Sequence, residues 1–119
     1  MSTRDTFTAA VPRAIEETEA YIDWEEHLDG SLFIKVTAAR EKIQSDGIIT
    51  SAKDLNDGLY EKKWNSGLRL YFAVVEREGR KTLLLLGSGK GKQQQKAINE
   101  SKKLLVEFRV IKENIVKKG

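Results

Sequence analysis

GLYEKKWNSGLRLYFAVVEREGRKTLLLLGSGKGKQQQ, residues 58–95, decides the fold of this 119-residue chain. Two groups of turn-forming residues interrupt it, Asn65-Ser66-Gly67 and Glu78-Gly79, and Asn and Gly favour tight turns because they tolerate positive φ. Between the turns, residues 68–75 alternate in the way expected of a strand with two unlike faces. Residues 82–86 form a continuous apolar run, typical of a strand that is buried on both faces. The stretch therefore predicts three antiparallel strands, followed by a loop rich in glycine and lysine.

The length of the first turn determines which residues of the first two strands face each other. A three-residue loop places Lys63 opposite Arg69, whereas a two-residue loop would break this pairing. With three residues, one face is expected to join the core and the other to carry polar groups: Tyr60, Trp64, Leu68, Leu70 and Phe72 on the first, Glu61, Lys63, Arg69 and Tyr71 on the second. Like charges directly opposite each other are unfavourable. Either both cations are solvated and offset by Glu61, or they form an anion site, most simply for phosphate. Lys62 falls on the apolar face and should lie near a sheet edge or extend its amine to solvent.

The residues before this stretch predict one strand and two helices. Residues 1–9 are polar and should form a loosely held extension. Residues 10–17 could form a short first strand, which its proline limits to a sheet edge or a strand start. Residues 19–28 follow a threonine suited to cap a helix, and residues 31–47 form a second helical pattern that ends at a glycine. Two helices joined by so short a turn predict an antiparallel helical hairpin.

The remaining segments complete the predicted architecture. Residues 48–57 are expected to be a loop, and residues 94–115 a long amphipathic helix, because their apolar positions recur at helical spacing. The order is then strand, helix, helix, three strands, helix. This order predicts one α+β domain over residues 1–119, with a small, mainly antiparallel sheet, an N-terminal helical hairpin on one face and a C-terminal helix.

Composition restricts both the compartment and the chemistry. The chain has no cysteine, so disulfides and cysteine-based metal sites are excluded. No apolar run approaches the roughly 20 residues of a membrane span, and no signal-peptide pattern opens the chain, so we expect a cytoplasmic protein without a membrane partner. The formal charge of +3 combines −6 over residues 1–60 with +9 over residues 61–119. This asymmetry suggests a basic surface for a polyanion, unless the charges of the two halves mix in the folded molecule.

Three stretches together resemble a known protein family. The stretches are Glu17-Thr18 with Tyr21, Trp24 and Leu28; Leu59-Tyr60-Glu61-x-Lys63 with Gly67-x-Arg69-x-Tyr71-Phe72; and Leu83 to Lys90 with Gln94 or Gln95, Ile98 and Lys102. Over roughly residues 10–105 the chain resembles the RelE/ParE superfamily of toxins from bacterial toxin–antitoxin modules, and most of all its HigB-like, phage-derived "addiction module killer" branch. The resemblance implies the same fold, ribosome-dependent cleavage of messenger RNA without a metal or cofactor, and neutralisation by a cognate antitoxin protein.

The resemblance also implies roles for individual residues. Arg69 matches the strand arginine that contacts the scissile phosphate, and Lys90 matches a basic residue in the loop after the last strand. Lys63 stands where the closest relatives usually have arginine, which keeps the charge but loses the bidentate fork for phosphate. The expected catalytic residues are Arg69, Lys63 and Lys90, and the expected RNA contacts are Lys92, Tyr71 and Lys96. Tyr71 would act by stacking on a base.

The chemistry of the residues agrees with RNA cleavage without a metal. The 2′-hydroxyl attacks the adjacent phosphate, cations stabilise the added negative charge, and a lysine crowded by other cations can act as a base. Replacing Arg69 by alanine should then abolish toxicity and leave the fold intact. Two other functions stay open: a non-enzymatic, ParE-like inhibitor of DNA gyrase, and an inactive relative that only binds RNA or an antitoxin. The second gains weight because no tyrosine or histidine follows Gly87, where some relatives place an acid/base side chain.

Overall fold

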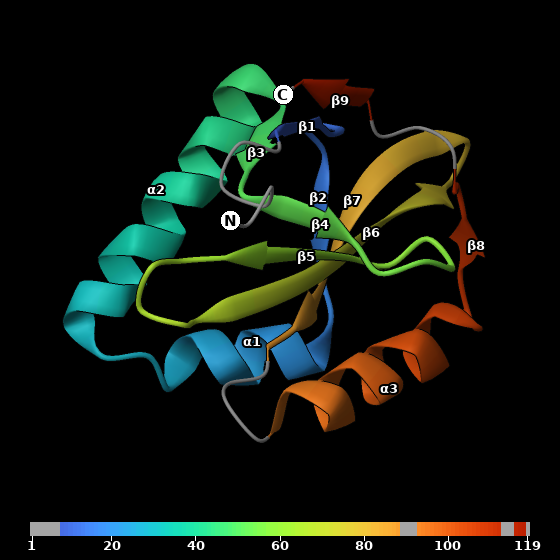
Figure 1. The fold of residues 1–119 in the computed structure, drawn as a ribbon. Coiled ribbons are helices and arrows are strands. Elements are labelled where there is room, and N and C mark those ends of the chain that lie inside the picture. Colours follow the sequence, from blue (N-terminus) through green and yellow to red (C-terminus); the bar gives the residue numbers. More distant parts are fainter. Residues whose placement is uncertain (1–7, 89–92, 113–115, 119) are drawn as a thin grey trace.

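The computed structural model describes residues 8–88, 93–112 and 116–118, and Figure 1 shows its fold. The elements are, in chain order, β1 (Thr8–Ala10), β2 (Ile15–Glu17), α1 (Glu19–Glu26), α2 (Gly30–Asp46), β3 (Ile48–Thr50), β4 (Ala52–Asp54), β5 (Tyr60–Lys63), β6 (Arg69–Arg77), β7 (Arg80–Gly87), α3 (Gln94–Leu105), β8 (Arg109–Val110) and β9 (Val116–Lys118). The predicted α+β class is confirmed.

The three predicted strands form the centre of a six-stranded sheet with the order β2-β7-β6-β5-β4, and β8 also pairs with β6. The loop between β5 and β6 has three residues: the Trp64 amide donates to the Leu68 carbonyl at 2.9 Å, and the Gly67 amide donates to the Trp64 carbonyl at 3.0 Å. Lys63 therefore pairs with Arg69, as predicted. The register confirms that the two faces of these strands carry the expected residues.

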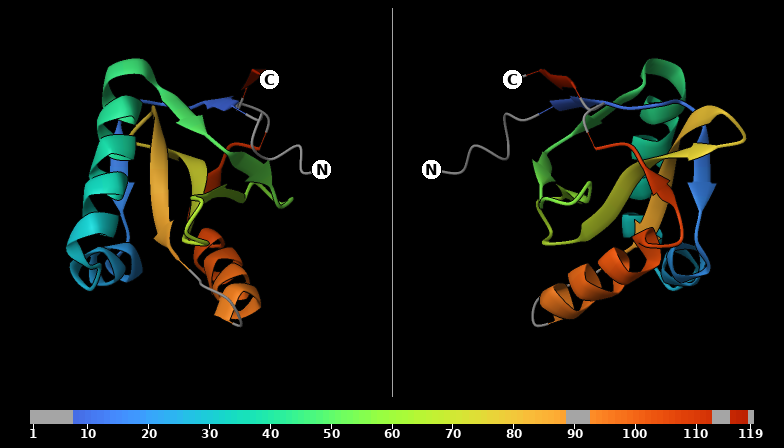
Figure 2. Two further views of the ribbon diagram at one scale, coloured as in Figure 1. Left: turned by 60° about the vertical axis from the view of Figure 1, so that its left-hand side comes forward. Right: turned by 90° about the vertical axis from the view of Figure 1, so that its right-hand side faces the viewer.

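Strand β7 is buried on both faces, as its run of leucines predicts. Leu83 and Leu85 belong to a core cluster shared with α1 and α2, and Leu84 and Leu86 belong to a second cluster shared with α3. None of these four side chains is more than 2 % exposed. The sheet is thus the middle layer of the molecule, with α1 and α2 on one face and α3 on the other (Figure 2).

Strand β2 makes the sheet mixed, because it runs parallel to β7. Thr18 follows β2 and caps α1: its hydroxyl accepts from the Tyr21 amide at 3.1 Å. Its own amide donates to the Leu85 carbonyl at 3.1 Å. The start of α1 is thereby fixed against β7. A separate three-stranded sheet has the order β3-β1-β9.

The predicted antiparallel helical hairpin is not confirmed. Helices α1 and α2 follow each other directly, but they run steeply across each other instead of side by side (Figures 1 and 2). Their buried residues explain the arrangement. Tyr21 of α1 and Ile43 of α2 both pack into the core cluster that includes β7, so each helix packs on the sheet layer and not mainly on the other helix.

The long C-terminal helix predicted over residues 94–115 is wrong over residues 106–112, and residues 113–115 lie outside the described residues. The chain turns after Leu105, and β8 pairs with β6, where Val75 faces Val110 and the Ile111 amide donates to the Val74 carbonyl at 2.9 Å. Residues 106–111 are rich in β-branched and aromatic residues, which favour a strand once a sheet edge is available. Gly58 allows the close approach, since its φ is +83° and an added Cβ would clash with the Val110 side chain.

Two further predictions need correction. Residues 48–57 contain β3 and β4 and are not simply a loop. The expected first strand over residues 10–17 is two strands in different sheets, separated by a bend that contains Pro12. The expected loose extension over residues 1–9 is contradicted at Thr8 and Ala9, which lie in β1 with Ala9 fully buried. Short strands of this kind are not visible in the sequence because they depend on partners that are distant along the chain.

Candidate functional site

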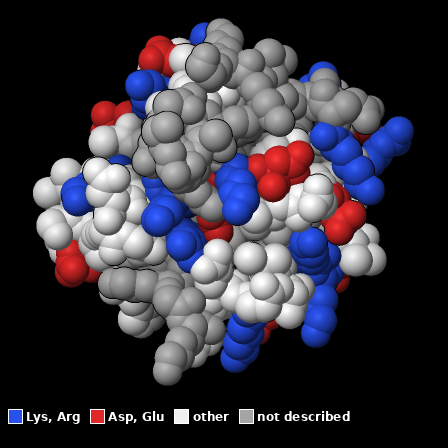
Figure 3. Space-filling model, in the orientation of Figure 1, with Lys and Arg blue, Asp and Glu red and all other residues white. Residues whose placement is uncertain are grey.

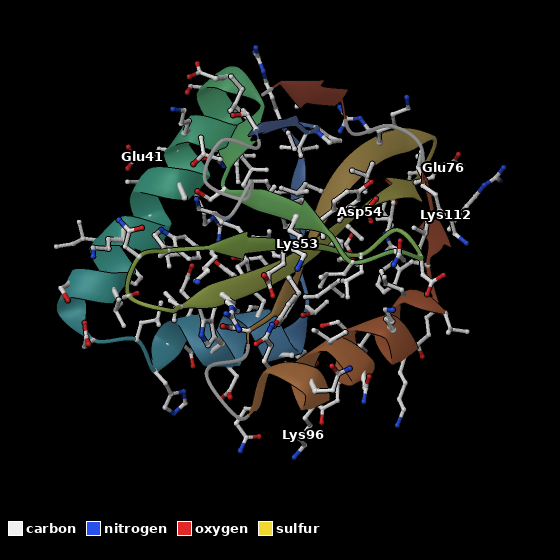
Figure 4. The ribbon with its side chains drawn as sticks, viewed as in Figure 1. Glu41, Lys53, Asp54, Glu76, Lys96 and Lys112 are labelled. Carbon is white, nitrogen blue, oxygen red and sulfur yellow. The ribbon has the colours of Figure 1, made fainter. Side chains whose placement is uncertain are left out.

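Three basic residues form a strip across neighbouring strands on the α3 side of the sheet. Lys63 and Arg69 face each other on β5 and β6, and Lys53 of β4 faces Glu61 of β5. Residues directly opposite in an antiparallel pair project to the same face, so all three share a face with Glu61. We call Lys53, Lys63 and Arg69 the cationic strip. Lysine and arginine side chains gather over the middle of this face in Figure 3, and Figure 4 places Lys53 over the central strands.

A buried carboxylate holds Arg69 in place. Glu61 is 0 % exposed, and its Oε2 lies 3.9 Å from Nε of Arg69, whose side chain is 19 % exposed. Gln94, the first residue of α3, bridges the two: its Oε1 accepts from Nη1 of Arg69, and its Nε2 donates to Oε2 of Glu61 at 3.4 Å. A buried charge needs a compensating partner, so Arg69 has a structural task as well as a position suited to binding.

The end of β7 is irregular next to Arg69. Tyr71 pairs with Gly87 but Phe72 pairs with Leu85, so one residue of β7 is extra, and Gly87 has a φ of +128°. Bulges of this kind redirect side chains and are frequent beside active sites. Here the bulge brings Ser88 to β6, where its hydroxyl donates to the carbonyl oxygen of Arg69.

Two of the predicted site residues, Lys90 and Lys92, lie outside the described residues. Ser88, the last described residue before them, and Gln94, the second described residue after them, both form hydrogen bonds with Arg69. The chain that carries the two lysines therefore leaves and rejoins the described structure next to Arg69.

The structure separates Tyr71 and Lys96 from the strip. Tyr71 is 0 % exposed and belongs to the core cluster beneath α3, so its ring has no surface on which a base could stack. Lys96 is exposed on α3, and it follows Gln94 by about 200° around the helix axis, on the side away from Arg69. Figure 4 shows Lys96 at the lower edge of the view, well apart from Lys53.

The opposite face of β5 buries a lysine that the sequence placed at an edge or in solvent. Strand β5 lies between β4 and β6, and Lys62 is 6 % exposed. Its Nζ donates to the carbonyl oxygen and to Oγ1 of Thr50, at 2.9 and 3.2 Å, and lies 4.8 Å from the ring centre of Trp64. Burial, with a smaller contribution from the charge of Lys42, lowers the pKa of Lys62 to about 8.

Sequence reasoning missed two members of this region for identifiable reasons. Lys53 was missed because residues 48–57 were expected to be a loop, and Ala52-Lys53-Asp54 has no apolar/polar alternation that would indicate a strand. The role of Gln94 was missed because helical periodicity does not say which side chain of a first turn reaches the sheet. No pattern in the sequence distinguishes the covered Glu61 from the more accessible Lys63, since they lie on the same face of one strand.

The arrangement suits the binding of an anion better than it suits proton transfer. The cationic strip carries three positive charges against the single carboxylate of Glu61, which is too deeply buried to meet a ligand. Tyr71 is equally buried, so Lys63 is the accessible ionisable group beside Arg69 within residues 8–88 and 93–112. Among the described residues, no group of three or more His, Asp or Glu side chains is placed to hold a metal.

The helices and the similarity of the chain to known proteins remain to be described. None of the helices in the described residues is long and apolar enough to cross a membrane. Comparison of the chain with protein-family models, curated proteins and solved structures found no match.

Proposed function

We propose that this chain is a RelE-like toxin that binds messenger RNA on the ribosome and cleaves it in the cytoplasm, and that a cognate antitoxin neutralises it. The observation that carries the proposal is the pairing of Lys63 with Arg69 on one face, next to Lys53. Like charges in this position repel each other, and an RNA phosphate would remove that repulsion. Between β2 and α3 the chain contains two helices and then the three antiparallel strands β5, β6 and β7 that the resemblance implies, but the short strands β3 and β4 lie between them.

In this proposal the strip binds the scissile phosphate and stabilises the charge that develops on it. The 2′-oxygen forms a bond to phosphorus and the bond to the 5′-oxygen breaks, which leaves a 2′,3′-cyclic phosphate and a 5′-hydroxyl. One proton leaves the 2′-hydroxyl and one reaches the departing 5′-oxygen. Arg69 and Lys63 supply positive charge, and Lys63 is the described side chain with access to move a proton.

A second function, RNA binding without cleavage, is favoured by one specific observation. Both Glu61 and Tyr71, which share the face of Arg69 and could act as acid or base, are fully buried, so that cleavage would depend on Lys63 among the described groups opposite Arg69. A domain of this kind would still bind the RNA backbone through the cationic strip, because phosphate contacts need only positive charge and access.

The burial of Glu61 changes the experiment that tests these functions. Arg69→Ala would remove the partner of a buried carboxylate and destabilise the fold, so loss of toxicity would not identify a catalytic residue. Arg69→Lys keeps a cation beside Glu61 and removes only the planar fork. Lys63→Gln removes one charge from a partly exposed position.

We would express the wild type, Arg69→Lys and Lys63→Gln in a bacterial host and map transcript ends by primer extension. If the chain is a nuclease, the wild type should arrest growth and cut transcripts at discrete positions. The amount of cut transcript should be about 100-fold lower in both variants. Lys35→Gln is the matched control, because Lys35 is an exposed lysine on α2, and it should cut like the wild type. Arrest without cuts would indicate a gyrase inhibitor, and binding of RNA without arrest would indicate the non-cleaving domain. Cuts that persist undiminished in both variants would refute the proposed site.

A further inference from the structure

A groove of about 720 Å³ lies between α1 and α3, at the end of the sheet where β7 stops. The α1–α2 turn closes one of its sides. Its floor is apolar and comes from every neighbouring element: Trp24, Leu28, Leu68, Leu86, Ala97 and Leu104. An apolar floor between two helices is the type of surface on which an amphipathic helix can lay its apolar face.

The charged residues in the described lining of this groove are acidic, apart from His27. Asp23, Asp29 and Glu100 line it together with His27, and no lysine or arginine is found among its described lining residues. This is unusual for a chain with 21 lysines and arginines against 18 acidic residues. Asp23 is well placed to meet a ligand, since its side chain is 78 % exposed. The described lining of the groove therefore presents negative charge, whereas the cationic strip presents positive charge.

We propose that this groove is a docking site for a basic amphipathic helix of a partner protein. Leucine-sized side chains of that helix would enter the floor beside Trp24, and its lysines or arginines would face Asp23, Asp29 and Glu100. Complementary charge of this kind sets specificity and the rate of association. The acidic rim argues against a nucleic acid as the occupant, because a phosphate backbone would be repelled.

Helices α1 and α3 of a second copy would fit the groove poorly. Helix α1 carries no lysine or arginine, and α3 turns Leu105 and Ser101 into the core. Helix α2 exposes Phe33 and Ile34, so self-association through α2 is the alternative that an experiment must distinguish.

The structure shows which substitutions remove the acidic charges of the groove without damage to the fold. Asp29 is the N-cap of α2, where its carboxylate accepts from the Leu32 amide at 3.0 Å. Asparagine caps helices about as well as aspartate, so Asp29→Asn removes the charge and keeps the cap. Asp23→Asn and Glu100→Gln are equally conservative on exposed helix surfaces.

The test uses Trp24 as the reporter of its own groove. In a Trp64→Phe background, Trp24 is the only tryptophan of the chain. The probe is an amidated peptide of about 18 leucines and lysines at helical spacing, long enough to be helical when bound. We expect a saturable change in Trp24 emission that is weakened about tenfold by Asp23→Asn/Asp29→Asn/Glu100→Gln. A peptide with glutamate in place of lysine should not bind.

The matched control is Glu41→Gln/Asp46→Asn/Glu78→Gln, which removes the same number of charges from exposed positions outside the groove. This variant should bind the lysine peptide like its parent. Equal weakening in both triple variants, or equal binding of the glutamate peptide, would overturn the proposal. So would sedimentation that shows a dimer of the unmodified chain which the groove variant dissociates, because the occupant would then be a second copy.

Discussion

Glu61 and Lys62 follow each other in β5, point to opposite faces of the sheet, and are 0 % and 6 % exposed. On the α3 side, Glu61 has a cation and an amide for partners, with Nε of Arg69 at 3.9 Å and Nε2 of Gln94 at 3.4 Å. On the other side, Lys62 donates to the carbonyl and hydroxyl oxygens of Thr50. Within the described chain, no carboxylate forms an ion pair with Lys62.

The difference shows two ways in which one strand accommodates a buried charge. The charge of Glu61 is balanced by Arg69, so the free energy of the site depends on keeping both members of the pair. The charge of Lys62 is balanced by the oxygen dipoles of Thr50 and by the ring of Trp64, without a carboxylate among its described partners, and the unfavourable burial is expressed as a pKa lowered to about 8. Breaking the first arrangement should therefore cost stability, and removing the charge from the second should add it.

The largest effect is expected from Arg69→Ala. The change leaves the carboxylate of Glu61 buried without its cation and should lower the free energy of unfolding by about 3 kcal/mol. The double variant Glu61→Gln/Arg69→Ala should be more stable than Arg69→Ala alone, because no uncompensated charge is left. Urea unfolding of the two single variants and the double variant measures this coupling.

Lys63→Ala is the control for the comparison of the two single variants with the double variant. Lys63 faces Arg69 on the neighbouring strand, but it is only partly buried and has no carboxylate that depends on it in the described structure. Its replacement should change stability by less than about 0.5 kcal/mol. Effects of Glu61→Gln and Arg69→Ala that simply add would show that Glu61 does not depend on Arg69.

The next effect concerns Lys62→Met, which keeps the apolar stem and removes the amine. Below pH 8 the lysine is protonated in the folded and unfolded states, and the folded state bears the full cost of burial, about 3 kcal/mol for the shift from 10.5 to about 8. Two hydrogen bonds to Thr50 offset part of this cost. The variant should therefore be about 1 to 2 kcal/mol more stable than the wild type at pH 7.

The lowered pKa of Lys62 also predicts how the difference in stability between Lys62→Met and the wild type changes with pH. Between pH 8 and 10.5 the folded protein loses the proton of Lys62 while the unfolded chain keeps it, so the wild type gains stability relative to Lys62→Met as pH rises. The advantage of the variant should shrink through this window in urea titrations at a series of pH values. Lys53→Met replaces an exposed lysine of the adjacent strand. Its free energy of unfolding should change with pH in parallel with that of the wild type. Parallel curves for Lys62→Met as well would contradict the lowered pKa.

The sequence contains enough information to predict the centre of the fold but not its periphery. The turn at residues 65–67 fixes the pairing of β5 with β6, and the leucine run of β7 reports burial on both faces, because both signals are local. Strands β4, β8 and β9 have two or three residues each. They form only because an edge or partner is present, and such tertiary context overrides the helical period in residues 106–112.

The same limit applies to the site. Alternation predicted that Lys63 and Arg69 share a face with Glu61 and Tyr71, and the register confirms it. Alternation cannot say which part of that face a distant helix will cover, and α3 covers Glu61 and Tyr71 completely. A polar residue on a strand can therefore be assigned to a face from sequence, whereas its access to a ligand depends on the packing of the whole chain.

The smallest effect concerns the hydroxyl of Thr50, a side-chain oxygen that accepts from the amine of Lys62. Thr50→Val replaces the hydroxyl that accepts from Nζ at 3.2 Å by a methyl group of similar size, on an exposed strand position that suits valine. At pH 7 the loss of this charge-assisted hydrogen bond should cost under about 1 kcal/mol, because the carbonyl oxygen of Thr50 still accepts from Nζ. The cost should fade as pH rises past 8, since a neutral amine donates more weakly. In a Lys62→Met background Thr50→Val should cost almost nothing, and an equal cost in both backgrounds would mean that the hydroxyl stabilises the strand independently of the buried charge.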